Sequence, residues 1–161
     1  PRAVMPLSVI VQEIQQQVVS LGVLGIIVLL TGEPLTWLWL GVIPILILQT
    51  LFNVGLAMMV ARWPAASRDL AQLIPFLLHT WRYLSGVMFS IPVFTADLDP
   101  WVEKALYLNP MTEYIELMRG CLMTSYDAPA YLWWLAGGWA VIFLVAGFVV
   151  FHRAEESYSR G

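Results

Sequence analysis

Charged residues and cysteine are scarce in this sequence. Only 12% of its 161 residues are charged, whereas a soluble domain has about 25%. Because 60% of the residues are hydrophobic, the composition predicts a membrane protein. The single cysteine, Cys121, excludes an internal disulfide, and we expect it to serve in packing.

Sequence motifs of catalysis are absent as well. The chain has no glycine-rich phosphate loop followed by lysine and serine or threonine, and no HExxH, GxSxG or cysteine–histidine cluster. No run of basic residues indicates a nucleic-acid partner. We therefore expect no enzyme, no cofactor and no metal site in this chain. Any source of energy must lie on another chain.

Long apolar runs dominate what is present. They cover residues 7–30, 35–61, 70–94 and 130–151. Each is long enough to cross a hydrocarbon core of about 30 Å at about 1.5 Å per residue. The sequence therefore predicts an all-α, polytopic bundle of four transmembrane helices with both termini on one side. No signal-peptide pattern precedes the first run, and we expect the chain to lack an N-terminal portion.

The basic residues assign the sides of this bundle. The predicted topology places five arginines on one face: Arg2, Arg62, Arg68, Arg153 and Arg160. The other face has only Lys104 and Arg119 beside seven acids: Glu33, Asp97, Asp99, Glu103, Glu113, Glu116 and Asp127. The positive-inside rule makes the arginine-rich face cytoplasmic, together with both termini and the polar tail 152–161. The net charge of -3 comes from the acidic outer face.

Polar residues and glycines interrupt three of the runs. The first run carries five polar residues near its start: Gln12, Glu13, Gln15, Gln16 and Gln17. They indicate either a cytoplasmic vestibule or a helix end that emerges from the bilayer, and both interpretations remain open. In the second run Gln49 and Asn53 lie one turn apart, which favours packing against a neighbouring helix over ligand contact. The last run has three glycines that permit close helix packing: Gly137, Gly138 and Gly147.

The third run is the most polar. Its spacing places four residues on one helical face: Gln72, His79, Arg82 and Gly86. An arginine inside a span costs about 2.5 to 3.5 kcal/mol on the insertion scale, so it normally faces protein or a water-filled cavity. We predict a polar pathway along this face. The alternative is that Arg82 extends to the interface or pairs with an outer acid and only fixes the position of the helix.

Two short helices are predicted between the third and fourth runs. Asp99-Pro100 and Asn109-Pro110 are successive cap-plus-proline signals, which favour helices over 100–108 and 110–123. Three charged residues of the second helix lie off its apolar face: Glu113, Glu116 and Arg119. We expect a helical hairpin, 100–123, that rests on or dips into the outer side of the membrane domain.

The order of these features resembles a known family. The chain contains, in order, PRAVMPLS, RDL, WRYLSGVMF, LNPMTEYIELMRG and GFVVFHRAEESYSRG. This series is similar to the C-terminal part of ABC-2 type permeases, in the Wzm-like variant that exports O-antigen, galactan or teichoic acid. The resemblance covers nearly the whole chain, and the asparagine-proline pair with the distal arginine is its most specific part. Such permeases have six spans, so the resemblance equates this chain with spans three to six.

The resemblance implies a homodimeric permease with two copies of a separate ATPase, which holds the ATP and Mg. It implies export of a lipid-linked glycan across the bacterial cytoplasmic membrane. The expected translocation path comprises Gln72, His79, Trp81, Arg82 and Tyr83. The expected outer gate helices carry Trp101, Tyr107, Asn109, Glu113, Tyr114, Glu116 and Arg119. The expected ATPase-facing loop contains Arg62, Arg68 and Asp69.

Three other functions remain alternatives. The first is an ABC-2 exporter of a drug or small lipid, which has the same outer helices. The second is an integral-membrane glycosyl or acyl transferase that uses the outer acids. The third is a non-catalytic membrane scaffold, in which Arg82 and His79 serve only in packing.

Overall fold

The computed structural model describes residues 4–61 and 68–158, and this part of the chain contains helices and no strand. The helices are α1 (Val4–Leu30), the 3-10 helix η1 (Trp37–Gly41), α2 (Val42–Val60), α4 (Arg68–Leu84), α5 (Ile91–Phe94), α6 (Pro100–Tyr107), α7 (Pro110–Leu122) and α8 (Tyr131–Tyr158). The all-α prediction is confirmed.

Two helical segments are long and apolar enough to cross a membrane. They are Trp37–Val60, formed by η1 and α2, and Tyr131–Arg153 of α8. A shorter apolar segment, Ile14–Leu30, lies in α1. A helical membrane protein follows from these segments, while the number of four spans stays a prediction.

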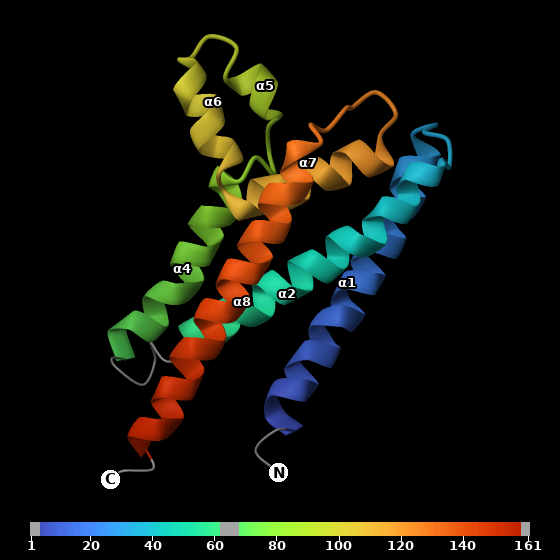
Figure 1. The fold of residues 1–161 in the computed structure, drawn as a ribbon. Coiled ribbons are helices and arrows are strands. Elements are labelled where there is room, and N and C mark those ends of the chain that lie inside the picture. Colours follow the sequence, from blue (N-terminus) through green and yellow to red (C-terminus); the bar gives the residue numbers. More distant parts are fainter. Residues whose placement is uncertain (1–3, 62–67, 159–161) are drawn as a thin grey trace.

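Helices α2 and α8 form the centre of the bundle, where they cross in contact with each other (Figure 1). At the crossing, a Cβ atom on Gly55 would overlap the backbone of Phe143, and one on Gly147 would overlap the backbone of Gly55. The predicted packing role is therefore met by Gly147. At Gly137 and Gly138 a Cβ atom would meet no neighbour among the described residues, so the packing role of these two glycines stays a prediction. Small residues at such a crossing let two backbones approach closely.

Aromatic side chains extend this centre to two more helices. Phe52 of α2 is 1% exposed. Its ring centroid lies 4.6 Å from that of Phe143 on α8, 5.8 Å from that of Tyr114 on α7 and 6.2 Å from that of Trp81 on α4. Tilted and edge-on ring pairs at these distances contribute stability beyond their buried area. Phe52 therefore joins four helices.

The third apolar run is not one continuous helix. Helix α4 ends at Leu84, and α5 begins only at Ile91. Gly86 between them has φ +77°, a left-handed conformation that glycine adopts without the steric penalty of other residues. The prediction of a helix over 70–94 is wrong for this reason, and Gly86 does not continue the face of Gln72, His79 and Arg82.

The two ends of the bundle differ. The start of α1 and the end of α8 lie at one end, and α5, α6 and the loop after α7 lie at the other (Figure 1). Helix α7 lies across the bundle and packs on η1, α2 and α8, whereas α6 projects away from the bundle (Figure 1). Helix α1 leaves most of its apolar side chains exposed, Val18 and Ile26 among them. In a membrane such a face meets lipid or another protein segment.

Candidate functional site

Asn109 connects the start of α7 to the end of α4. Its Oδ1 accepts hydrogen bonds from the Met111 backbone N–H at 3.2 Å and from the Trp81 Nε1 at 2.7 Å. Its Nδ2 donates to the Ser85 Oγ at 2.9 Å. The predicted cap is confirmed here, and the same side chain fixes the α4 end against α7. Asp99, by contrast, precedes α6 without a side-chain cap bond.

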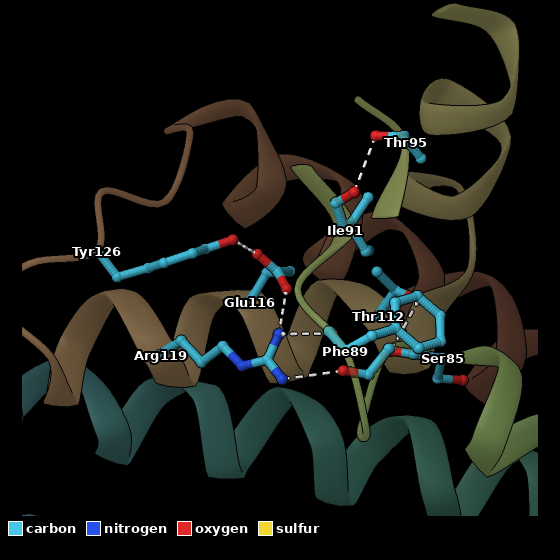
Figure 2. Close-up of polar contacts among 9 residues, drawn as sticks. Ser85, Phe89, Ile91, Thr95, Thr112, Glu116, Arg119 and Tyr126 are labelled. Atoms are coloured by element: carbon cyan, nitrogen blue, oxygen red, sulfur yellow. Dashed lines mark hydrogen bonds and ion pairs between the residues drawn. The ribbon is translucent and has the colours of Figure 1, made fainter. Parts of the chain in front are cut away.

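Glu116 and Arg119 form the second connection (Figure 2), in which the Glu116 side chain is fully buried and that of Arg119 is partly buried. Arg119 Nη1 pairs with Glu116 Oε1 at 2.7 Å, and Nη2 donates to the Gly86 carbonyl at 2.9 Å. Nη1 also reaches the Phe89 carbonyl at 3.5 Å, and the Tyr126 hydroxyl donates to Glu116 Oε2. These bonds hold α7 to the break between α4 and α5 and to the loop before α8.

The acids of α7 are therefore not on a solvated face. Glu113 and Glu116 are both 0% exposed. The prediction that these two acids lie off the buried face of the helix is wrong. Its physical basis was their displacement from the apolar stripe, but α8 and the α7–α8 loop cover that side as well.

Within the described part of the chain, neither carboxylate oxygen of Glu113 accepts a hydrogen bond. It lies on α7, whose 13 residues are too few to span a bilayer. Burial raises the pKa of Glu113 from its ordinary value of 4.5 to about 8, and the nearby Trp139 indole lowers that pKa in part. A carboxyl group in an apolar site is neutral at pH 7 when its pKa is raised this far.

This pKa predicts how stability depends on pH. Between pH 4.5 and 8 the folded protein holds a proton on Glu113 that the unfolded chain has lost. The contribution of this proton to the free energy of unfolding is complete below pH 4.5 and is lost as the pH rises to about 8. Over this range the free energy of unfolding falls by up to about 1.4 kcal/mol per pH unit. We expect Glu113→Gln to remove this slope, measured by thermal unfolding of the purified protein from pH 5 to 8. Equal slopes in both proteins would contradict the prediction, and Glu103→Gln on α6 is the control.

A polar cavity of about 460 Å³ lies among α1, α2, α4 and the underside of α7. Six polar residues line it: Gln16, Gln17, Ser20, Gln49, Asn53 and Arg82. Of the polar cluster at the start of α1, Gln16 and Gln17 line this cavity, whereas Gln12 and Gln15 are exposed and do not. Both interpretations of the cluster remain open. Gln49 and Asn53 were expected to pack against a neighbouring helix, and they line a cavity instead. The only sign of this in the sequence was that Gln49 and Asn53 are one turn apart on the same helical face.

An apolar cavity of about 490 Å³ adjoins the polar one. The two share four lining residues: Leu24, Gln49, Met111 and Met118. The apolar face of α7, with Ile115 and Leu122, forms much of its wall. Helix α7 therefore contacts one polar and one apolar cavity.

The structure separates the residues of the expected path. Arg82 lines the polar cavity, and Trp81 is packed against Phe52 and bonded to Asn109. The remaining three are exposed and line neither of these cavities: Gln72, His79 and Tyr83.

The other expected site residues fall into three environments. Tyr107 and Tyr114 are buried, and the Tyr114 hydroxyl donates to the Ala136 carbonyl at 3.0 Å. Trp101 is 67% exposed on α6. Arg62 and the side chain of Arg68 lie outside the described residues, and Asp69 lies in the first turn of α4. Among the described residues, no three His, Cys, Asp or Glu side chains gather closely enough to hold a metal.

Polar side chains around a cavity between the helices of a membrane bundle are typical of a transporter. The family profile described as ABC-2 type transporter matches residues 1–123. The chain therefore belongs to the ABC-2 type transporter family. The O-antigen export system permease protein RfbA of Myxococcus xanthus is 28% identical over 131 residues, which are 81% of this chain and 46% of that protein. The chain thus spans about half the length of this curated relative.

No solved structure matches the chain. The family and the relative confirm the predicted resemblance to Wzm-like permeases. They also indicate a transporter rather than an enzyme, so the transferase alternative is not pursued.

Proposed function

We propose that this chain is part of the permease subunit of an ATP-driven exporter that moves a lipid-linked polysaccharide across the bacterial cytoplasmic membrane. The observation that carries the proposal is the pair of adjoining cavities beneath α7, one polar and one apolar. A lipid-linked glycan has both kinds of surface. Its sugars and phosphate need hydrogen-bond partners inside the membrane, and its tail needs an apolar wall.

Arg82 has a specific role in this proposal. Its guanidinium is always charged and matches the geometry of a phosphate with two parallel hydrogen bonds. The amides of Gln49 and Asn53 on the facing helix can donate to and accept from sugar hydroxyls. We therefore assign the lipid-phosphate group to Arg82 and the first sugars to the amides.

The proposed partners are a second copy of the permease and two copies of an ATPase that holds ATP and Mg. Family membership supports an ATPase partner. The exposed apolar faces of α1 and α4 support contacts with further membrane segments. The start of α4, with Asp69 in its first turn, lies at the end of α4 remote from α7 (Figure 1), which suits contact with a cytoplasmic ATPase and cytoplasmic termini.

We expect Arg82→Ala to reduce export about tenfold to hundredfold without preventing assembly, because a hydrogen bond to a charged group contributes about 1.5 to 3 kcal/mol. The measurement is surface glycan per amount of assembled permease. His79→Ala is the matched control, since His79 lies on the same helix and lines neither cavity. Unchanged export by Arg82→Ala at a normal protein level would overturn the assignment.

The apolar cavity also fits a second candidate, an exporter of a drug or small lipid. Its volume of about 490 Å³ is within the range of small-molecule pockets, about 300 to 1,000 Å³. The two candidates differ in what stimulates the ATPase. Affinity purification of the intact gene product first establishes whether a P-loop ATPase accompanies it. Stimulation of that ATPase by lipid-linked polysaccharide, and not by lipid alone, then selects the polysaccharide exporter.

A further inference from the structure

A third cavity, of about 550 Å³, lies on the opposite side of α7 from the polar one. It is bounded by η1, the second half of α7, the loop 123–130 and the start of α8. Three aromatic side chains and two polar ones face it: Trp37, Tyr126, Trp133, Thr124 and Asp127. It shares only Met123 with the apolar cavity and no residue with the polar one. It is therefore a separate site at the outer end of the bundle.

The loop that forms one wall of this cavity is fixed at several points. The Thr124 backbone N–H and hydroxyl donate to Glu33 Oε2 at 3.1 and 2.7 Å. The Tyr126 hydroxyl donates to the buried Glu116. At Gly120 a Cβ atom would come within 2.6 Å of the Ala128 Cβ, so the loop packs directly on α7. A wall held in this way is ordered before any ligand binds, which lowers the entropic cost of binding.

The chemistry of the wall selects a ligand class. Indole and phenol rings offer flat apolar faces, and Thr124 and Asp127 offer a hydroxyl and a carboxylate. A sugar ring has apolar C–H faces and hydroxyl groups around its edge, so it can stack on the rings and bond to the polar pair. The lining contains no lysine, arginine or histidine, and the carboxylate repels a phosphate.

Membrane anchoring accounts for some of the aromatic residues at this end of the bundle, but not for all of them. Tryptophan is enriched at membrane interfaces, and Trp134 fits that role because it is 86% exposed and lines no part of the cavity. Trp37 is equally exposed, at 87%, and nevertheless lines the cavity together with Asp127 and Tyr126. The two tryptophans are about equally exposed, but only Trp37 lines the cavity. Replacing each in turn therefore distinguishes ligand binding from membrane anchoring.

We propose that this outer cavity is a binding subsite for uncharged sugar rings of the exported glycan. This subsite rests on the proposed function. It adds a second binding position, near the exit from the membrane, that does not bind the phosphate-bearing end of the substrate. Trp37 provides the stacking surface, and Asp127 accepts hydrogen bonds from sugar hydroxyls. The inner polar cavity with Arg82 and this outer cavity then bind different parts of one substrate.

The test uses the intact permease in lipid nanodiscs and saturation-transfer NMR with the methyl glycosides of glucose, galactose, mannose and rhamnose. We expect transfer to at least one glycoside, and at least a fivefold weaker signal in Trp37→Ala and in Asp127→Asn. Trp134→Ala, with equal exposure of the replaced ring, should retain the wild-type signal. Glucose 1-phosphate should give a weaker signal than the neutral glycosides.

Two results would overturn the subsite: no transfer to any of the four glycosides, or a signal in Trp37→Ala equal to that of the wild type. ATPase stimulation by lipid-linked polysaccharide is measured on the same preparation. Stimulation without glycoside binding contradicts the subsite and leaves the proposed function standing. Glycoside binding that Trp37→Ala removes, without stimulation, contradicts the proposed function and leaves a sugar site.

Discussion

Arg119→Ala is expected to lower the free energy of unfolding by about 3 kcal/mol, because it leaves a buried carboxylate without its partner. Glu116, which is 0% exposed, would keep only its bond from Tyr126. The carbonyls of Gly86 and Phe89 would lose their donor at the break between α4 and α5. We expect the outer layer of α5, α6 and α7 to loosen, and the amount of folded permease in the membrane to fall severalfold.

The measurement is thermal unfolding of the purified permease together with its level in membranes. Arg119→Lys is informative because lysine keeps the charge but lacks the planar fork that reaches Glu116 and Gly86 together. It should fall between the wild type and the alanine variant. Lys104→Ala, at an exposed position of α6, is the control and should stay within about 0.5 kcal/mol. A melting temperature of Arg119→Ala equal to that of Lys104→Ala would contradict the assignment.

Gly147→Leu is expected to prevent the close approach of α2 and α8. A Cβ atom at this position would already overlap the backbone of Gly55. The neighbour is backbone rather than a flexible side chain, so the helices must move apart and leave Phe52 and Phe143 less well packed. The expected loss is about 3 kcal/mol or more, at the upper end of overpacking effects. We expect little folded permease to accumulate.

The same helix supplies the matched control. Gly137→Leu and Gly138→Leu introduce the same side chain where a Cβ atom meets no neighbour. Both should accumulate near the wild-type level, measured by membrane fractionation and by unfolding of the purified protein. Equal losses for Gly137→Leu and Gly147→Leu would show that the defect comes from the leucine itself and not from the helix crossing. Gly55→Leu should repeat the effect of Gly147→Leu from the other helix.

Several features of the fold were predictable because they depend on neighbouring residues in the chain. The length and composition of the apolar runs predict helices. The Asn109-Pro110 signal predicts the start of α7, because the cap and the first helical residue are adjacent. Arg82 was a candidate path residue because of the energetic cost of a charge within an apolar run. The structure places it on a polar cavity.

Other features of the site do not depend on neighbouring residues in the chain and could not be predicted from the sequence. The glutamines of α1 and the amides of α2 come together only because two distant helices face each other across one cavity. His79 and Arg82 share a predicted face, yet only Arg82 lines that cavity. Spacing along one helix assigns residues to faces, but it does not say which neighbour each face meets. The outer cavity has the same origin, since two distant stretches of the chain, 37–41 and 117–133, meet there.

The sequence by itself determined that this is a helical membrane protein, where the capped helix α7 begins, and which charged residue within an apolar run is unusual. The tertiary structure alone decided that Glu113 and Glu116 are buried, that Arg119 bonds to the break after α4, and that Gly147, not Gly137, lies at the helix crossing. The physical reason is that helix formation and membrane insertion depend on local residues. Burial, ion pairing and close helix contact depend on what remote segments bring to the same place.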